Sequence, residues 1–244
     1  MGESTSIEWT DATWNPWMGC LKVSPGCKQC YMYRDMKRYG RNPKVVTRSK
    51  TTFNNPLKWV NQKKPGTKIF TCSWSDWFID QADEWRDEAW DIARQTPQFI
   101  YQILTKRPEN IADRLPADWG DGWPNVWLGV SVESKQYLHR AWHLRDIPAA
   151  VRFISYEPAL EFVNFNELFM AGGIHWLISG GESGYDPRPV NLGWFTHARE
   201  ACQRHGVAYF HKQNGGNRKI DGAWGGRKLD GRTWGEFPTV EAIA

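Results

Sequence analysis

Short apolar runs of strand length recur along the chain, and each is followed by polar residues and then by a helical or loop stretch. This alternation is typical of repeated β-α units. We expect a first strand within Ile7–Trp14 and later ones at Ile69–Cys72, Phe99–Leu104, Val126–Val130, Val151–Ile154, Trp176–Ile178 and Val207–Phe210. Apolar residues at helical spacing predict helices over Glu84–Arg94, Lys135–Leu144 and Phe195–Arg204.

The strand runs are continuous rather than alternating, as expected for parallel strands that are buried on both faces. The pattern therefore predicts an α/β fold, a partial or complete (β/α) TIM-like barrel with parallel strands, and an open doubly wound sheet is the main alternative. The chain has 244 residues, which is enough for one such barrel. We expect the barrel over residues 1–214 and an irregular C-terminal extension, packed on the barrel, over residues 215–244.

Composition is ordinary except in its tryptophan content. Hydrophobic residues make up 41% and charged residues 24% of the chain, as in most globular proteins. No segment has the roughly 18 continuous apolar residues of a membrane helix, and the N-terminus has no signal-peptide pattern. We therefore expect no membrane contact and a cytoplasmic location, bacterial or, if the protein is viral, in the host. The 16 Trp residues must largely occupy pockets, grooves or interfaces.

Charge is unevenly distributed along the chain, although the net formal charge is only +4. The segment Arg34–Lys68 is strongly basic and contains Asp35 as its one acidic residue, whereas Asp80–Asp91 is acidic. Basic residues interleaved with aromatic ones suit phosphate contacts and base stacking. Arg34–Lys68 is therefore a possible nucleic-acid surface, and a solvated charged face is an equal alternative.

Three of the five cysteines, Cys20, Cys27 and Cys30, lie within eleven residues, in the segment GCLKVSPGCKQCY. An odd number of cysteines in a cytoplasmic chain argues against a disulfide framework and favours a metal site. A structural zinc site normally needs four ligands, and no His precedes His139. Three thiolates on a four-iron cluster leave one iron open to a substrate or cofactor. The spacing therefore favours an iron-sulfur cluster and leaves zinc as the alternative.

Polar groups follow every expected strand after the first. Because the carboxyl ends of parallel barrel strands form the active-site face, these groups predict a polar pocket there. They are Ser73, Ser75 and Asp76; Thr105, Lys106 and Arg107; Ser131 and Glu133; Ser155 and Glu157; Ser179 and Glu182; and His211, Lys212 and Gln213.

The segment WNPWMGCLKVSPGCKQCY resembles the cluster loop of radical S-adenosylmethionine enzymes, particularly the spore photoproduct lyase and DNA repair photolyase branch. That loop reads approximately Asn-Pro-aromatic-x-Gly-Cys and then Cys-x-x-Cys-Tyr. This chain departs from it in one respect, because six residues rather than three separate the first two cysteines.

Further segments extend the resemblance. SWSDWF at Ser73–Phe78, LTKRP at Leu104–Pro108 and GVSVES at Gly129–Ser134 are similar to segments that follow the second, third and fourth strands in that branch. The chain from IEWTDATWNPW through ISYEP and ISGGESG to LDGRTWGEFP resembles the phage-associated three-cysteine-motif family of uncharacterised proteins.

The resemblance implies a barrel of radical S-adenosylmethionine type and two cofactors, a 4Fe-4S cluster on the three cysteines and S-adenosylmethionine. In this interpretation Asp76 or Glu133 accepts from the cofactor ammonium, Lys106 pairs with its carboxylate, and Ser73 and Ser131 reach its amino acid or ribose. Many radical enzymes use a Gly-Gly-Glu segment after the second strand. Here that segment follows the sixth, so we assign substrate contact, rather than cofactor binding, to Glu157, Glu182 and Arg188.

The implied reaction generates a 5′-deoxyadenosyl radical that abstracts hydrogen from the substrate. The expected electron donor is a protein of flavodoxin or ferredoxin type, and a further partner protein is possible. The basic segment, the tryptophans and the photolyase-like motifs favour a nucleic acid or nucleotide as the substrate, in modification or repair. The alternative is a non-catalytic, zinc-containing nucleic-acid-binding protein, which leaves the acidic residues at successive strand ends unexplained.

Overall fold

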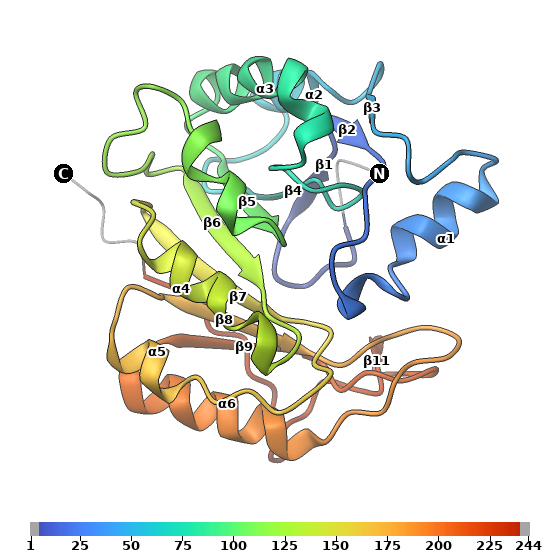
Figure 1. Ribbon diagram of the computed structural model, residues 1–244, viewed down its shortest axis with the longest axis vertical. Helices are drawn as coiled ribbons and strands as arrows, with labels where there is room; N and C mark the ends of the chain where they lie inside the picture. Colours follow the sequence, from blue (N-terminus) through green and yellow to red (C-terminus); the bar gives the residue numbers. More distant parts are fainter. Residues whose placement is uncertain (1–4, 240–244) are drawn as a thin grey trace. The chain divides into compact units, whose positions relative to one another are not determined.

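Figure 1 shows the computed structural model, which describes residues 5–239. The chain packs as two compact units. Unit 1 comprises residues 1–128 and 147–150, and unit 2 comprises residues 129–146 and 151–244. These units reflect the density of packing and do not test the expected barrel over residues 1–214 with its extension, which stays a prediction.

The main sheet has seven strands, which are hydrogen-bonded in the order β1-β4-β5-β6-β7-β8-β9. They are β1 (Ala12–Trp14), β4 (Lys68–Thr71), β5 (Ile100–Thr105), β6 (Val126–Ser131), β7 (Val151–Tyr156), β8 (Trp176–Gly180) and β9 (Ala208–Gln213). The pairs β1-β4, β4-β5, β7-β8 and β8-β9 are parallel. The expected mixed α/β fold with a parallel sheet is therefore confirmed, and the strand order is compatible with a partial α/β barrel.

Unit 1 adds three helices and a small two-stranded sheet to its part of the main sheet. The helices are α1 (Tyr31–Arg38), α2 (Asn55–Trp59) and α3 (Asp83–Gln95), and α2 and α3 lie side by side in Figure 1. The strands β2 (Trp17–Met18) and β3 (Thr47–Arg48) pair antiparallel. Helix α3 has Asp83 and Glu84 in its first turn and Arg94 in its last, which stabilises the helix dipole at both ends.

Tryptophan rings form much of the core of unit 1. Trp77 contacts Trp14, Trp17 and Trp90, with ring centroids 5.7, 5.1 and 4.8 Å apart, and all four side chains are fully buried. Tilted and edge-to-face contacts of this kind are the favoured geometries for aromatic pairs. The unusual tryptophan content is therefore explained in large part by the core.

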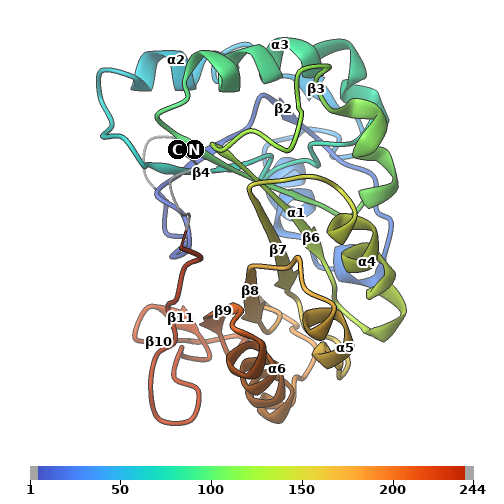
Figure 2. The ribbon, with the colours of Figure 1, turned by 90° about the vertical axis from the view of Figure 1, so that its left-hand side faces the viewer.

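Unit 2 contains α4 (His139–Arg145), α5 (Asn166–Met170) and α6 (Leu192–His205). Figure 2 shows α5 and α6 beside each other and the hairpin of β10 (Lys219–Ile220) and β11 (Ala223–Trp224) on the other side of β9. Helix α6 begins after Asn191, whose side chain accepts from the Gly193 N–H, and it ends at Gly206 in the left-handed conformation. The expected helix Lys135–Leu144 is wrong in its first turn, because Lys135–Tyr137 forms a separate 3₁₀ turn.

The C-terminal segment is held against β9. Phe210 bridges Gly235, the Glu236 N–H donates to Tyr209 O over 3.1 Å, and Trp176 Nε1 donates to Glu236 O over 2.9 Å. The expectation that this segment is irregular needs one correction, since it contains the β10-β11 hairpin. In the described part of the chain, every helix is too short or too polar to cross a membrane.

The β6-β7 contact in unit 2 requires a glycine. A Cβ atom at Gly129 would lie only 2.3 Å from Cζ of the fully buried Phe153 ring. We expect Gly129→Ala to lower the free energy of unfolding by about 1–3 kcal/mol, because the ring has no space to move away. In a Phe153→Leu background the cost of Gly129→Ala should fall. Urea denaturation of the two single variants and the double variant measures this coupling, and strictly additive losses would contradict the steric explanation.

Candidate cysteine site

The cysteine loop, residues 19–30, begins directly after β2. Gly19 has a φ of 101°, and a Cβ atom there would lie 2.3 Å from Val45 O, so only glycine fits. The next N–H group, that of Cys20, donates to Pro43 O over 2.9 Å. Cys20 is therefore fixed at its backbone by the segment that leads into β3.

The other two cysteines occupy the turn that leads into α1. Cys27 ends the 3₁₀ turn Pro25–Cys27, and its sulfur lies 3.8 Å from Ser24 Oγ. Cys30 is the N-cap residue of α1. The nearby backbone N–H groups of Met32 and Tyr33 lower the pKa of its thiol and partly offset the rise that burial causes. Donors at a helix N-terminus stabilise negative charge, so this position suits a thiolate.

All three cysteine residues of the loop are half-buried, and their sulfurs are close enough to influence one another electrostatically. Burial, and secondarily the Asp76 carboxylate, raises the pKa of Cys20 to about 12, and burial also raises the pKa of Cys30. Both groups are therefore neutral thiols near pH 7 unless a metal displaces their protons. Cys202 is buried in unit 2, whereas Cys72 is buried at the end of β4, close enough to Cys20 for the two to interact electrostatically; burial raises the pKa of both.

The donor set is compatible with an iron-sulfur cluster, because it consists of three soft thiol ligands from one loop. It does not match a preformed single-ion site. A tetrahedral zinc ion at about 2.3 Å from each sulfur brings its thiolates to within roughly 3.8 Å of one another. Within residues 5–239, no three His, Cys, Asp or Glu side chains converge closely enough to hold one ion.

Side chains that flank the cysteine loop, and side chains of the segment after β4, tie these two parts of unit 1 together. Asn15 Nδ2 donates to Ser73 Oγ over 2.9 Å, and Asn15 Oδ1 accepts from the Trp74 N–H over 2.7 Å. Ser75 Oγ donates to Gly19 O over 2.6 Å, and Tyr31 OH donates to Ser73 O over 2.7 Å. The loop is therefore held at the carboxyl end of β4, where the sequence predicted the site.

The buried pair Asp76–Arg107 completes this connection at the end of β5. The Asp76 carboxylate accepts from Arg107 Nη1 and from the backbone N–H groups of Lys106 and Phe78, each over 3.0 Å, and from Thr105 Oγ1 over 2.6 Å. Arg107 Nη2 donates to Leu21 O over 2.8 Å, and its Nη1 lies 3.9 Å from Cys20 Sγ.

This arrangement changes the interpretation of two residues. Asp76, expected to accept from a cofactor ammonium, already accepts four hydrogen bonds from the protein. Arg107, to which the sequence gave no role, connects that carboxylate to the cysteine loop. Lys106 remains available, because its half-buried ammonium pairs with no acidic side chain among residues 5–239, and its charge lowers the pKa of Cys30.

In unit 2 the predicted acidic residues also follow strand ends. Ser131 and Glu133 are fully buried after β6, and Glu133 Oε2 pairs with Arg140 Nη1 over 2.9 Å. Arg140 also donates to Ser131 O over 3.0 Å. The other carboxylate oxygen, Glu133 Oε1, is buried and accepts no hydrogen bond from the described residues. Leaving a buried carboxylate oxygen without a hydrogen-bond donor costs free energy. Among the described residues of unit 2, Glu133 Oε1 is the buried acceptor that is open to a donor from a ligand.

The predicted substrate residues are engaged in ion pairs of unit 2. Glu157 Oε1 accepts from Lys212 Nζ over 2.6 Å, and a Cβ atom on Gly180 would lie 3.2 Å from the Glu157 carboxyl carbon. Glu182 is buried and accepts from the backbone N–H and the Nε of Arg188 over 3.0 and 2.8 Å. The sequence gave no indication that Arg188 would be the partner of Glu182.

Ser179, His211 and Asn214 form a hydrogen-bonded line in unit 2. His211 Nδ1 lies 2.9 Å from Ser179 Oγ, and its Nε2 lies 3.0 Å from Asn214 Oδ1. Burial lowers the pKa of His211 to about 4, so the imidazole is neutral near pH 7. Ser179 and His211 are both fully buried, so this line is a structural link to the C-terminal segment rather than a nucleophilic site.

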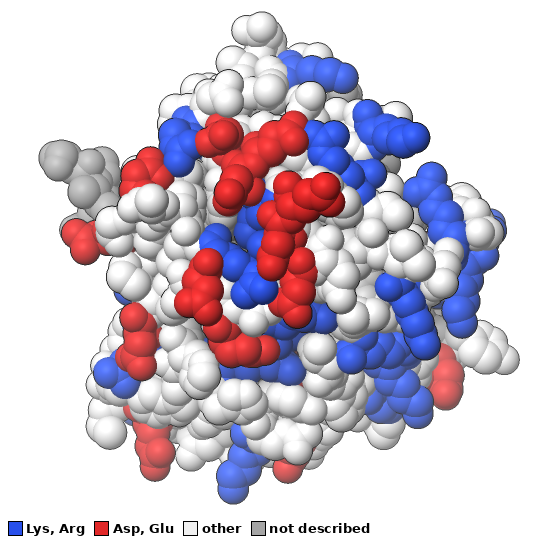
Figure 3. Space-filling model, turned by 45° about the horizontal axis from the view of Figure 1, so that its top comes forward, with Lys and Arg blue, Asp and Glu red and all other residues white. Residues whose placement is uncertain are grey.

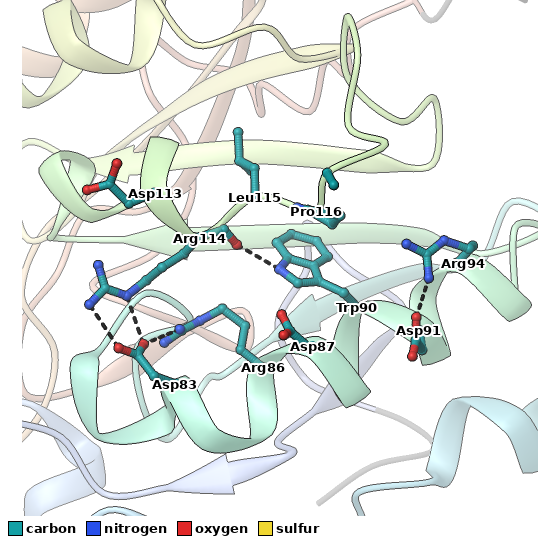
Figure 4. Close-up of a pocket in the computed structure, with 11 residues that line it drawn as sticks. Asp83, Arg86, Asp87, Trp90, Asp91, Arg94, Asp113, Arg114, Leu115 and Pro116 are labelled. Atoms are coloured by element: carbon teal, nitrogen blue, oxygen red, sulfur yellow. Dashed lines mark hydrogen bonds and ion pairs between the residues drawn. The ribbon is translucent and has the colours of Figure 1, made fainter.

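A cavity of about 740 Å³ is lined by α3 and the segment 113–117 (Figure 4), and none of the predicted site residues lines it. Its charges pair internally: Arg114 Nε donates to Asp83 Oδ1 over 2.8 Å, and Arg94 pairs with Asp91. Figure 3 shows the same region as acidic side chains gathered around arginines. We regard it as a neutralised surface cluster without chemistry of its own.

Taken together, unit 1 is an α/β structure in which three cysteines of one loop are fixed at the carboxyl ends of parallel strands. The chain belongs to the family described as "Protein of unknown function (DUF5131)", whose model matches residues 4–238. No curated protein and no solved structure matches the chain.

The Asp76–Arg107 pair should make a large contribution to stability. Asp76→Ala leaves the Arg107 guanidinium buried without its partner, and we expect a loss of about 3–5 kcal/mol in the free energy of unfolding. The double variant Asp76→Ala/Arg107→Met should lose less than Asp76→Ala alone, because it removes the uncompensated charge. Urea unfolding of both variants and of Arg107→Met tests this, and a double variant less stable than Asp76→Ala would refute it.

Proposed function

We propose that this protein is a radical S-adenosylmethionine enzyme whose 4Fe-4S cluster is held by Cys20, Cys27 and Cys30. The observation that carries the proposal is the placement of three half-buried, electrostatically coupled thiols at the carboxyl ends of β4 and β5. The motif resemblance of the loop and of the segments after β4, β5 and β6 supports the same assignment. In this proposal the enzyme acts in the cytoplasm.

When bound, the cluster and S-adenosylmethionine would supply an electron transfer that releases a 5′-deoxyadenosyl radical. The chain's own residues position and shield this chemistry. Arg107 holds Asp76 and Leu21 through hydrogen bonds, and its Nη1 donates to Cys20 Sγ over 3.9 Å. Hydrogen bonds to ligand sulfurs are one means by which proteins set the reduction potential of such a cluster.

Lys106 is the best candidate in unit 1 for the cofactor carboxylate. It is half-buried, has no acidic partner among the described residues and lies close enough to Cys30 to affect its pKa. Ser73 is also half-buried at the loop, where its hydroxyl bonds with Asn15. Because Asp76 is saturated with donors, we assign it to positioning Arg107. Glu133 in unit 2 is the other ammonium acceptor that the resemblance implies, and its Oε1 is open. Ser131 then supports Glu133 through their shared partner Arg140.

For the substrate we propose a nucleic acid or nucleotide, modified or repaired by hydrogen abstraction. The basic segment Arg34–Lys68 supports a polyanionic partner, since it contains one acidic residue and most of its charged side chains are exposed. Glu157, Glu182 and Arg188 are the proposed substrate contacts. A flavodoxin- or ferredoxin-type protein would deliver the electron, and a further partner protein could complete the site.

The cysteine assignment is tested by anaerobic reconstitution with iron and sulfide, followed by absorption spectroscopy and iron analysis. We expect the wild-type protein to retain the cluster and each of Cys20→Ala, Cys27→Ala and Cys30→Ala to lose it while remaining folded. Cys72→Ala and Cys202→Ala are the matched controls and should retain it. Equal loss in Cys72→Ala would show that the ligand set is wrong. Tight zinc binding without cluster formation would favour the zinc-containing nucleic-acid-binding protein instead.

The role of Lys106 is tested by the affinity of the reconstituted protein for S-adenosylmethionine. Lys106→Ala should weaken binding by about 1–3 kcal/mol, because a shielded hydrogen bond to a charged group is lost. The iron content should not change. Lys28→Ala removes an exposed lysine of the cysteine loop and should bind like the wild type. A binding isotherm for Lys106→Ala that matches the wild type would remove Lys106 from the site.

A further inference from the structure

In unit 2, the loop of residues 181–188 is closed by an ion pair and presents one aromatic ring. Glu182 near its start binds Arg188 at its end through the side chain and the backbone N–H of that residue. Tyr185 lies midway between them and is 98% exposed, more than any other large hydrophobic residue described. A single exposed apolar residue does not by itself indicate a binding surface. Whether Tyr185 belongs to one depends on the residues around it.

The neighbour of this loop is the segment that leads to the β10-β11 hairpin, and the two run side by side (Figure 1). Ser183 forms a parallel bridge with Gly216, and the Gly216 N–H donates to Glu182 O over 2.8 Å. Tyr185 and Arg218 each follow the bridged pair by two residues, so the ring and the guanidinium belong to adjoining segments.

Two exposed cations, Arg218 and Lys219, lie on the segment that adjoins the Tyr185 loop, and Asp186 and Asp221 are the exposed acidic residues of the two segments. Arg218 and Lys219 are exposed, and no acidic side chain within residues 5–239 forms an ion pair with either. Lys219 Nζ lies 5.6 Å from the ring centroid of the half-buried Trp224 across the hairpin. The two segments thus combine an exposed aromatic face with free positive charge.

This combination fits a single-stranded nucleic acid better than a protein. A protein interface needs a contiguous apolar centre, whereas Ile220, which is 55% exposed, is the one other strongly exposed apolar side chain of the hairpin. Unpaired bases stack on aromatic rings while their phosphates bind Lys and Arg, and this mode tolerates any base. In a duplex the base faces are already stacked on each other and cannot meet Tyr185.

We propose that Tyr185, Arg218 and Lys219 form a binding platform for single-stranded nucleic acid, with the Tyr185 ring stacked on one base and the two cations on the flanking phosphates. The Glu182–Arg188 pair holds the loop so that the ring is presented without a large loss of conformational entropy on binding. This inference rests on the nucleic-acid substrate class of the proposed function and narrows it to single strands.

The test uses the full chain without metal, so that its outcome does not depend on the cluster. The probe is a fluorescein-labelled 12-nucleotide oligothymidylate, and binding is followed by anisotropy. Tyr185→Ala should weaken binding roughly 10- to 100-fold, the effect of losing one stacked base. Tyr185→Trp should bind at least as well as the wild type. Phe162→Ala removes another exposed aromatic ring of unit 2 and should have no effect.

The salt dependence of binding separates the contribution of the Tyr185 ring to affinity from that of the two cations. Each phosphate contact contributes a slope of about −0.7 to the logarithm of affinity against the logarithm of salt concentration for single strands. Arg218→Ala/Lys219→Ala should therefore reduce the slope by about 1.4. Tyr185→Ala should leave the slope unchanged while lowering affinity at every salt concentration.

Three results would overturn the platform: no binding by the wild type at low salt, equal affinity of Tyr185→Ala and wild type, or equal affinity for the oligothymidylate and a duplex of the same length. Lys44→Ala/Lys50→Ala is the comparison variant for the basic segment. Complete loss in this variant, with none in Tyr185→Ala, would place the nucleic acid on Arg34–Lys68. A protein that binds the oligonucleotide but cannot hold iron would retain the platform and refute the proposed enzyme.

Discussion

The cysteine loop depends on one buried ion pair. Asp76 and Arg107 come from the segments after β4 and β5, and both are almost fully removed from water. A buried pair of this kind costs desolvation energy, and the cost is offset here because each group has several further hydrogen-bond partners. Those partners include the backbone of the loop at Leu21, so the position of Cys20 is coupled to the register of two neighbouring strands.

Ion pairs at strand ends also occur in unit 2, with different residues. The acidic residues after β6, β7 and β8 have cationic partners: Glu133 with Arg140, Glu157 with Lys212, and Glu182 with Arg188. Pairing explains how carboxylates can follow consecutive strands without mutual repulsion. One acceptor, Glu133 Oε1, is left over from this arrangement. Among the described residues of unit 2, these paired charges leave one buried carboxylate oxygen without a donor.

The strands and the long helices were predictable from the sequence because their burial follows regular periods. All seven strands of the main sheet overlap the expected apolar runs, and α3 and α6 extend the expected helices by a few residues. Helices α1, α2 and α5 were missed. Two of them have only five residues, and α1 directly follows the cysteine cluster, so neither a long apolar period nor a clear cap identifies them.

The site was predictable in its residue types and not in its pairings. The polar residues at strand ends were identified, because chain order alone places them at one edge of a parallel sheet. The structural roles of Asn15 and Arg107 depend on side-chain partners 58 and 31 positions away, at Ser73 and Asp76. Local sequence patterns do not reveal pairs of residues that are so far apart in the sequence. The ion pair of Asp76 also explains why a residue with the right chemistry is occupied before any ligand arrives.

The six residues between Cys20 and Cys27 do not stretch the cysteine loop, because part of them is taken up by the compact turn Pro25–Cys27. The length of this loop is therefore taken up in part by a local turn rather than by the distance between Cys20 and Cys27. A search pattern that fixes cysteine spacing would pass over this chain. A pattern that instead combines Asn15 and Gly19 with Ser73, Asp76 and Arg107 would tolerate loops of varied length, and it could recover distant relatives that motif scans overlook.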